Sequence, residues 1–141
     1  MIYLTRRERF NAAHRLYKEG WSDEQNFEVF GKCSYPNWHG HNYDLIVTVK
    51  GNINLETGMF INLKTLSDII KSEILEKVDH KNLNLDVPFL EGKVTTTENV
   101  VIEFWKILDE KLRLLNDVNC QLHCIKLYET PRNFVEYYGE K

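Results

Sequence analysis

Two histidines with a single glycine between them, His39 and His41, constrain this chain more than any other feature of its sequence. Alternate side chains of an extended strand lie on one face, so the two imidazoles would stand roughly 6.5 Å apart and could bind one metal ion. A third imidazole from another strand would leave the fourth tetrahedral position open, as zinc is held in catalytic sites. The motif therefore predicts a strand that begins at the histidines, and it favours an enzyme.

The length and composition of the chain indicate one domain over residues 1–141. Hydrophobic residues make up 43% of the chain, and no Pro-, Gly- or Ser-rich segment divides it, which suits one compact core. The net charge of −3 and the pI near 6.0 argue against a nucleic-acid partner, whereas the locally basic first third suits an anionic small substrate. No apolar run of about 18 residues is present, so we expect no membrane partner.

The N-terminal residues and the cysteines bear on the location of the protein. Met1 to Leu4 run directly into arginines at positions 6 and 7 rather than into the apolar segment of an export signal. We therefore expect a cytoplasmic protein whose three cysteines are reduced thiols. Cys120 and Cys124 are expected in the core, whereas Cys33 precedes His39 by six residues and is a candidate for the site.

The hydrophobic pattern of the first half predicts strands with a short helix between them. In chain order, we expect a strand over residues 2–14, a short helix between Ser22 and Gly31 that buries Phe27 and Phe30, a loop that carries Cys33, a strand over 41–49 and a short strand over 59–61.

The second half predicts two longer helices and a terminal strand pair. Asn62 caps a helix that ends before Asp79, and threonines 95–97 cap a helix over 98–115. Strands over 121–129 and 134–138 follow. This order predicts an α+β fold with the helices on one face of a small antiparallel sheet. The open edges of such a sheet favour assembly with other subunits.

Six short motifs resemble those of the 6-pyruvoyl tetrahydropterin synthase family. They are Phe10-Asn-Ala-Ala-His14-Arg-Leu, Phe30-Gly-Lys-Cys33, His39-Gly-His41-Asn-Tyr43, Asp79-His80-Lys-Asn-Leu83, Thr96-Thr97-Glu98-Asn99-Val100 and Tyr128-Glu129-Thr130. Together they cover nearly the whole chain in the family's order. The resemblance implies the tunnelling fold, in which a four-stranded antiparallel sheet with two long helices trimerises into a barrel. Two trimers would stack as a homohexamer with active sites at the subunit interfaces.

The resemblance also implies the site and its reaction. It matches the zinc ligands of the family to His14, His39 and His41, the catalytic residues to Cys33, Asp79 and His80, the pterin-anchoring carboxylate to Glu129, and the pocket segment from a neighbouring subunit to Thr96, Thr97 and Glu98. The family converts 7,8-dihydroneopterin triphosphate, a pterin triphosphate, to 6-pyruvoyl-tetrahydropterin and releases triphosphate. The ring is reduced internally, so zinc is the only cofactor implied.

The residue types suit these roles. A thiolate at Cys33 would act as a general base, because adjacent metal or imidazolium charge favours that form. Asp79 would orient the imidazole of His80 for proton transfer. Glu129 would accept hydrogen bonds from the amidine-like edge of a pterin.

Simpler structural roles compete with these assignments. A threonine cap followed by an acid in the first helical turn also explains residues 96–98, and Asp79 with His80 would suit the end of a helix. His123 has no partner motif and is expected to be structural. Trp38 introduces a large aromatic side chain immediately before the metal motif, and the segment from Leu115 to Gln121 is longer than in animal members of the family.

Two other functions remain open. 6-Carboxytetrahydropterin synthase of queuosine biosynthesis uses the same substrate and zinc, but usually places its cysteine four positions before His-Gly-His. The offset of six here favours the pyruvoyl product. A binding module that retains a pterin or a purine without turnover is the second alternative.

Overall fold

The computed structural model describes residues 1–115 and 119–140. Its elements are β1 (Ile2–His14), α1 (Asp23–Phe30), the 3₁₀ helix η1 (Gly31–Ser34), β2 (His39–Gly51), α2 (Leu63–Ile70), the π turn η2 (Lys71–Leu75), α3 (Glu76–Val78), β3 (Lys81–Asn82), the 3₁₀ helix η3 (Pro88–Leu90), α4 (Thr97–Leu114), β4 (Gln121–Tyr128) and β5 (Phe134–Tyr137). The α+β order is confirmed, and the second strand begins at the histidines. The long segment before β4 includes residues 116–118, which lie outside the described residues.

The sheet has the strand order β3-β1-β2-β4-β5. β1 with β2, β2 with β4 and β4 with β5 pair antiparallel, whereas β3 lies parallel to β1. The expected number of four strands is therefore wrong, because β3 adds a fifth. With two residues, Lys81 and Asn82, β3 is too short for a periodic pattern, and only its pairing with Ala12 and Ala13 makes it a strand.

The short strand expected over residues 59–61 does not form. The N–H of Asn54 donates to the carbonyl of Met59 at 2.8 Å, which closes a turn there. Phe60 is buried, and its ring lies so close to Gly51 that an added Cβ at the glycine would be 2.4 Å from Phe60 Cδ2. Phe60 therefore packs over the end of β2, and the segment does not pair as a strand.

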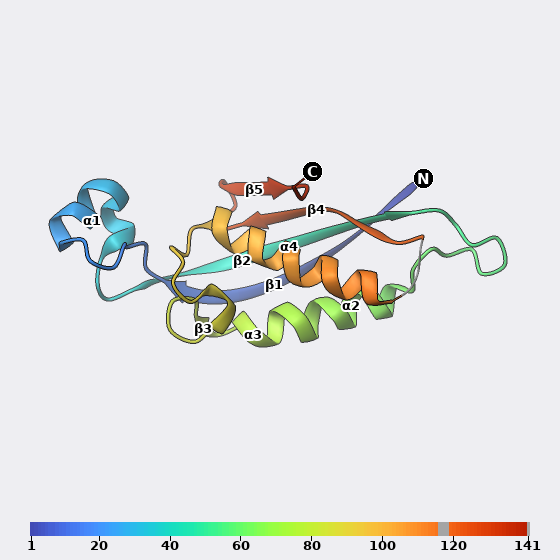
Figure 1. Cartoon of the computed structure of the whole chain (residues 1–141), viewed down its shortest axis with the longest axis horizontal. Helices are drawn as coiled ribbons and strands as arrows, with labels where there is room; N and C mark the ends of the chain where they lie inside the picture. Colours follow the sequence, from blue (N-terminus) through green and yellow to red (C-terminus); the bar gives the residue numbers. More distant parts are fainter. Residues whose placement is uncertain (116–118, 141) are drawn as a thin grey trace.

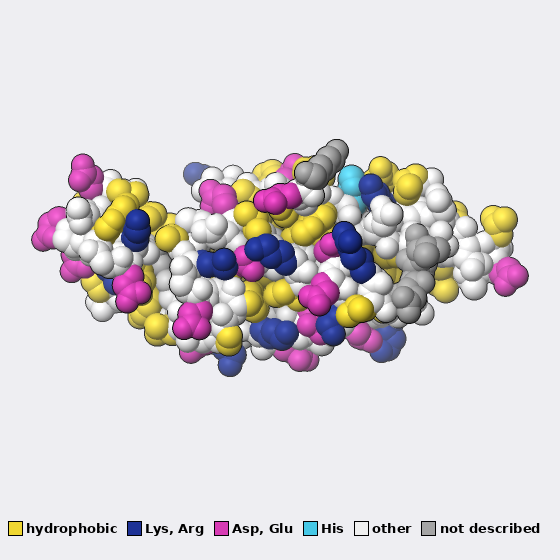
Figure 2. Space-filling model, in the orientation of Figure 1, with side chains coloured by type: hydrophobic (Ala, Val, Ile, Leu, Met, Phe, Trp, Pro, Cys, Tyr) yellow, Lys and Arg dark blue, Asp and Glu magenta, His cyan; other side chains and the backbone are white. Residues whose placement is uncertain are grey.

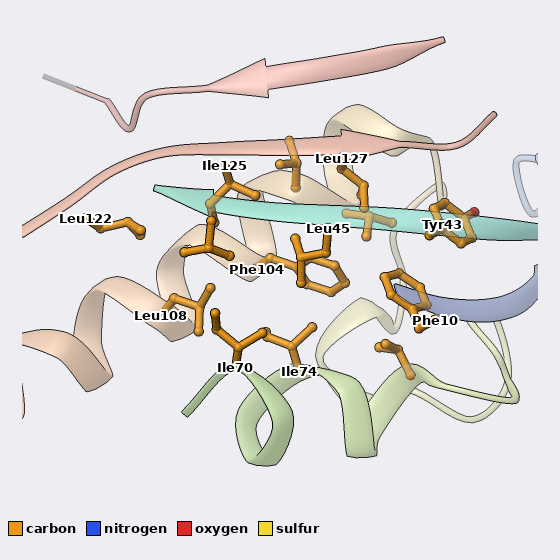
Figure 3. Close-up of a cluster of buried hydrophobic side chains, with 14 of the residues drawn as sticks. Phe10, Tyr43, Leu45, Ile70, Ile74, Phe104, Leu108, Leu122, Ile125 and Leu127 are labelled. Atoms are coloured by element: carbon orange, nitrogen blue, oxygen red, sulfur yellow. The ribbon is translucent and has the colours of Figure 1, made fainter. Parts of the chain in front are cut away.

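The helices α2, α3 and α4 lie on one face of the sheet, as expected (Figure 1). Alternate residues of β2 point to this face, and the largest of them, Tyr43 and Leu45, are at most 1% exposed. Figure 3 shows them packed among side chains from both helical segments and from the neighbouring strands, including Phe10, Ile70, Ile74, Phe104, Leu108, Ile125 and Leu127. Among the described helices, none is long and apolar enough to cross a membrane.

The helix predicted after Asn62 begins there but is interrupted by a π turn. The Asn62 Oδ1 atom accepts a hydrogen bond from the N–H of Lys64 at 2.8 Å. Ile70, Ile74 and Val78 are all fully buried at intervals of four residues. In an α-helix each such step rotates the side chain by about 40° away from the previous one, and the wider π turn absorbs this drift. All three side chains therefore face the sheet.

α1 forms a lobe at one end of the molecule, away from the helices that cover the sheet (Figure 1). Ser22 caps it as predicted, but the expected burial of two phenylalanines is wrong. Phe27 is 49% exposed and stacks on Tyr35, and Phe30 is only partly buried. Asn26 is the buried residue of α1, because its side chain bonds backbone groups of the preceding loop. Hydrophobic side chains therefore gather on the surface of the lobe (Figure 2).

Candidate active site

The pairing of β1 with β2 gathers three histidines. His14 lies opposite His39 in the register, and Ala12 lies opposite His41. Because strand positions two apart share a face, the three imidazoles project from the face that the helices cover. Their ring centroids are 4.5 Å apart for His14 and His39, 5.0 Å for His14 and His41, and 4.9 Å for His39 and His41. The structure thus brings the three predicted metal ligands together.

The orientation of the imidazoles suits metal binding. His14 is fully buried, and its Nδ1 atom lies 2.9 Å from the carbonyl oxygen of Thr95. That carbonyl accepts a hydrogen bond, so the ring carries its proton on Nδ1 and leaves the Nε2 lone pair free. The Nε2 atoms of all three histidines are buried without a hydrogen-bond partner within the described part of the chain. A divalent cation would satisfy these atoms.

Glu129 brings a carboxylate to the histidines from the end of β4. Its Oε1 atom lies 2.9 Å from His41 Nε2 and 3.5 Å from His14 Nε2, and its Oε2 atom accepts a hydrogen bond from Thr97 Oγ1 at 3.1 Å. One ligand atom from each histidine and one from Glu129 all lie within 4.8 Å of one another. Three imidazoles and a carboxylate are a ligand set that zinc accepts, so the residues fit the metal that the resemblance implies.

The electrostatics of the cluster favour the ligand forms of these groups. Contacts with the imidazoles of His14 and His41 hold the pKa of the Glu129 carboxyl far below its ordinary value. Burial, and next the proximity of His14 and His41, lower the pKa of His39. Near neutral pH, Glu129 is therefore an anion and His39 is a neutral imidazole, which is the form that binds metals.

Asp79 and His80 form a second pair at the edge of β1. Asp79 Oδ1 accepts a hydrogen bond from the N–H of Asn11 at 3.0 Å and lies 3.1 Å from His80 Nδ1. The N–H of His80 donates in turn to the carbonyl of Asn11 at 2.7 Å, and the backbone of His80 has a positive φ of 61°. Partial burial acts to raise the pKa of Asp79, but the Asn11 N–H and His80 outweigh it, so the pKa is lowered. The imidazole itself stays exposed.

One hollow of about 670 Å³ connects the two groups, because His41, Asp79, His80 and Glu129 all line it. The residues come from β2, from the turn before β3 and from the turn after β4. A volume of this size suits a small organic ligand. The structure therefore places both an anionic anchor and an exposed imidazole around the same space.

The family model described as 6-pyruvoyl tetrahydropterin synthase matches residues 3–140. The chain belongs to this family. It is 47% identical over 137 residues to the 6-pyruvoyl tetrahydrobiopterin synthase of Pongo abelii, with 97% of this chain and 91% of the relative covered. The solved structure of Caenorhabditis elegans 6-pyruvoyl tetrahydropterin synthase matches with a TM-score of 0.88 at 39% identity, with 99% and 96% covered. A 6-carboxy-5,6,7,8-tetrahydropterin synthase of Rickettsia conorii is 30% identical, with 96% and 99% covered.

Cys33, which the sequence predicts as a catalytic residue, stands apart from this cluster. Cys33 lies in η1 rather than in a loop, and it is partly buried. Among the described residues, its sulfur is not one of the ligand atoms that lie within 4.8 Å of one another, and the residue does not line the hollow. Cys120 and Cys124 are buried, as predicted.

Residues 96–98 were predicted either to cap a helix or to line the pterin pocket, and the structure separates their roles. Thr96 caps α4, because its Oγ1 atom accepts a hydrogen bond from the N–H of Asn99 at 3.3 Å. Thr97 instead contacts the carboxylate of Glu129. Glu98 is exposed in the first turn of α4. Of the three residues, only Thr97 is joined to the histidine cluster within one chain.

Two residues beside the predicted ligand His14 were missed in the sequence. Thr95 was expected only as a cap, but it is fully buried and holds the His14 ring through its carbonyl. Arg15 follows His14 directly, donates from Nε to the carbonyl of Ser34 at 2.6 Å and stacks over the ring of Tyr17. The only feature of the sequence that could have indicated Thr95 or Arg15 was its position next to a motif residue.

Proposed function

We propose that this chain converts 7,8-dihydroneopterin triphosphate to 6-pyruvoyl-tetrahydropterin with elimination of triphosphate. The observation that carries the proposal is the convergence of three buried Nε2 atoms and the carboxylate of Glu129 on one point. It occurs in a chain that matches the synthase family over nearly its full length. In this proposal His14, His39 and His41 would hold zinc. The ion would act as a Lewis acid that polarises a substrate oxygen.

Glu129 orients the pterin ring in this mechanism. Because its pKa is held low, the carboxylate is charged at neutral pH and accepts two N–H groups from the amidine-like edge of the ring. Thr97 donates a hydrogen bond to one carboxylate oxygen and so helps to orient the group. A ring fixed in this way presents its side chain toward the histidines, which lowers the entropy loss of the chemical steps.

Cys33 and the pair Asp79–His80 move protons. Each step removes a proton from a carbon that carries a hydroxyl group. We assign the general base to Cys33 on the family resemblance, since within one chain this residue lies in η1 and does not line the hollow. Asp79 would hold the proton of His80 on Nδ1, which leaves the opposite nitrogen as acceptor or donor of a residue that lines the hollow. The exposed imidazole exchanges protons with solvent between steps.

The assembly that we propose is a homohexamer in the cytoplasm. Within the described residues of one chain, β3 covers β1 only at Ala12 and Ala13, so the outer edge of β1 has no strand partner from Ile2 to Phe10. β5 forms the opposite edge of the sheet. Unpaired edges of this kind pair with other strands, and pairing between copies would close the sheet into a barrel and bring neighbouring subunits to each site.

The carboxy branch is the second candidate, since the Rickettsia conorii relative shares the length of the chain at 30% identity. The higher identity of 47% to the pyruvoyl relative favours the first. A binding module is the remaining alternative.

Turnover separates an enzyme from a binding module. Zinc-loaded protein is incubated with 7,8-dihydroneopterin triphosphate, and released triphosphate is measured over time, with Cys33→Ala as the matched variant. We expect release by the wild-type protein and its loss in Cys33→Ala. Binding of the substrate without consumption would contradict the proposal and leave the module.

A further inference from the structure

We propose that Glu129 is a displaceable fourth ligand of the metal centre, which closes the centre at rest and leaves it when a pterin ring binds the same carboxylate. The inference rests on the metal site of the proposed function. It adds that pterin recognition and access to the metal are coupled through one side chain.

The position of the carboxylate supports this role. Glu129 Oε1 lies 2.9 Å from His41 Nε2 and 3.5 Å from His14 Nε2, so it points at the place where the histidine lone pairs converge. The same four residues form one group of ligand atoms. A carboxylate oxygen binds zinc at about 2.0–2.2 Å, and Oε1 needs only a small movement to reach a shared ion.

The exposure of His14, His41 and Glu129 indicates which of these side chains is able to leave. The His14 side chain is fully buried and the His41 side chain is 17% exposed, whereas Glu129 keeps 24% of its side-chain surface. Glu129 is therefore the most exposed of these three side chains, and it also lines the hollow of about 670 Å³. A ligand that enters this hollow therefore has direct access to the carboxylate, beside His41.

The second carboxylate oxygen is already held. Thr97 Oγ1 donates to Oε2 at 3.1 Å, which leaves Oε1 for the metal. The backbone of Glu129 is fixed by its N–H, which donates to the carbonyl of Asn133 at 3.1 Å. The backbone therefore stays in place, and only a rotation of the side chain separates the closed from the open centre.

A pterin and the metal would compete for this carboxylate. The ring offers two N–H donors to an anion, and charge-assisted pairs of this kind are strong. When the ring takes the carboxylate, the fourth metal position opens to the substrate side chain. Coupling between two binding events is reciprocal, so a small ligand on the metal must also raise the affinity for the ring.

Cobalt(II) in place of zinc makes the fourth position observable. We would measure the longitudinal relaxation of solvent water protons, which is enhanced when the paramagnetic ion carries an exchanging water, and titrate azide by visible absorption. The pterin probe is unsubstituted pterin, which has no side-chain hydroxyl groups to bind the metal. The variant is Glu129→Gln, and the matched control is Glu110→Gln, an exposed glutamate on α4.

We expect little water relaxation by the cobalt-loaded wild type and Glu110→Gln, and a several-fold increase in Glu129→Gln. Saturating pterin should raise the relaxation of the wild type and lower its azide dissociation constant by at least about fivefold. The inference is overturned if the wild type already relaxes water as strongly as Glu129→Gln, or if pterin binds without changing either signal. Failure of the wild type to bind cobalt or zinc at all would overturn the proposed metal site itself.

Discussion

The thermal stability of the protein should depend on zinc through the three histidines. An ion that binds the folded state alone stabilises it by about 2.7 kcal/mol at a free concentration of 100 times its dissociation constant. For a chain of 141 residues, we expect this to raise the melting temperature by roughly 10 °C. The variant is His41→Gln, because this histidine is partly exposed and its replacement leaves no large cavity.

The assay is scanning calorimetry with zinc and with a chelator. The wild type should show the zinc-dependent shift, and His41→Gln should lose most of it. His123→Gln is the matched control, because His123 contacts only Tyr3 and Tyr138 among the aromatic rings of the described chain. It should keep the full shift.

The chelated wild type should still unfold cooperatively. The core beneath the helices is made of apolar side chains from β2, α2 and α4, so it does not depend on the ion. A chelated protein that has no unfolding transition would show a structural zinc site and refute the reasoning. An equal shift in His41→Gln and wild type would show that zinc binds elsewhere.

Three further outcomes follow from the described contacts. Hydrogen bonding to Arg7 lowers the pKa of Asp44 below its ordinary value, against the effect of burial. The stabilisation by this ion pair is therefore present above about pH 4 and is lost as the pH falls through the folded pKa. Between pH 4 and 2, the free energy of unfolding in urea should fall by up to about 1 kcal/mol more in the wild type than in Asp44→Asn. Gly51→Ala places Cβ 2.0 Å from the carbonyl oxygen of Asn119 and should lower the free energy of unfolding by about 1–3 kcal/mol while the zinc-dependent shift stays; a stability equal to wild type would contradict this. Arg15→Gln removes the hydrogen-bond donor to Ser34 in η1, the 3₁₀ helix that carries Cys33. This variant should lower kcat by about 10- to 100-fold with a smaller change in KM, and Arg15→Lys should recover part of the loss. An unchanged kcat would show that Arg15 does not position η1.

The sequence predicted the regular parts of this fold because their periodic patterns are long. β1, β2 and α4 each span more than ten residues, and their burial alternates or repeats as the pattern requires. β3 could not be predicted, because two residues carry no period. The π turn was also missed, since the spacing of Ile70, Ile74 and Val78 resembles an ordinary amphipathic helix until their full burial is known.

The candidate site also has a part that the sequence pattern predicted and a part that it could not predict. The spacing of His39 and His41 predicts a shared face from strand geometry alone, and the register with β1 then supplies His14. The approach of Glu129 depends on the pairing of β2 with β4 across a long stretch of sequence, which no local pattern encodes. The roles of Cys33, Asp79 and His80 came from the family resemblance, and the structure alone joins only the last two to the hollow.

The identity of the product tests the central claim most directly. Zinc-loaded protein would be incubated with 7,8-dihydroneopterin triphosphate under anaerobic conditions, and the pterin products identified by mass spectrometry. The account predicts 6-pyruvoyl-tetrahydropterin, absent with Cys33→Ala. Formation of 6-carboxytetrahydropterin together with acetaldehyde would contradict it and place the chain in the queuosine branch.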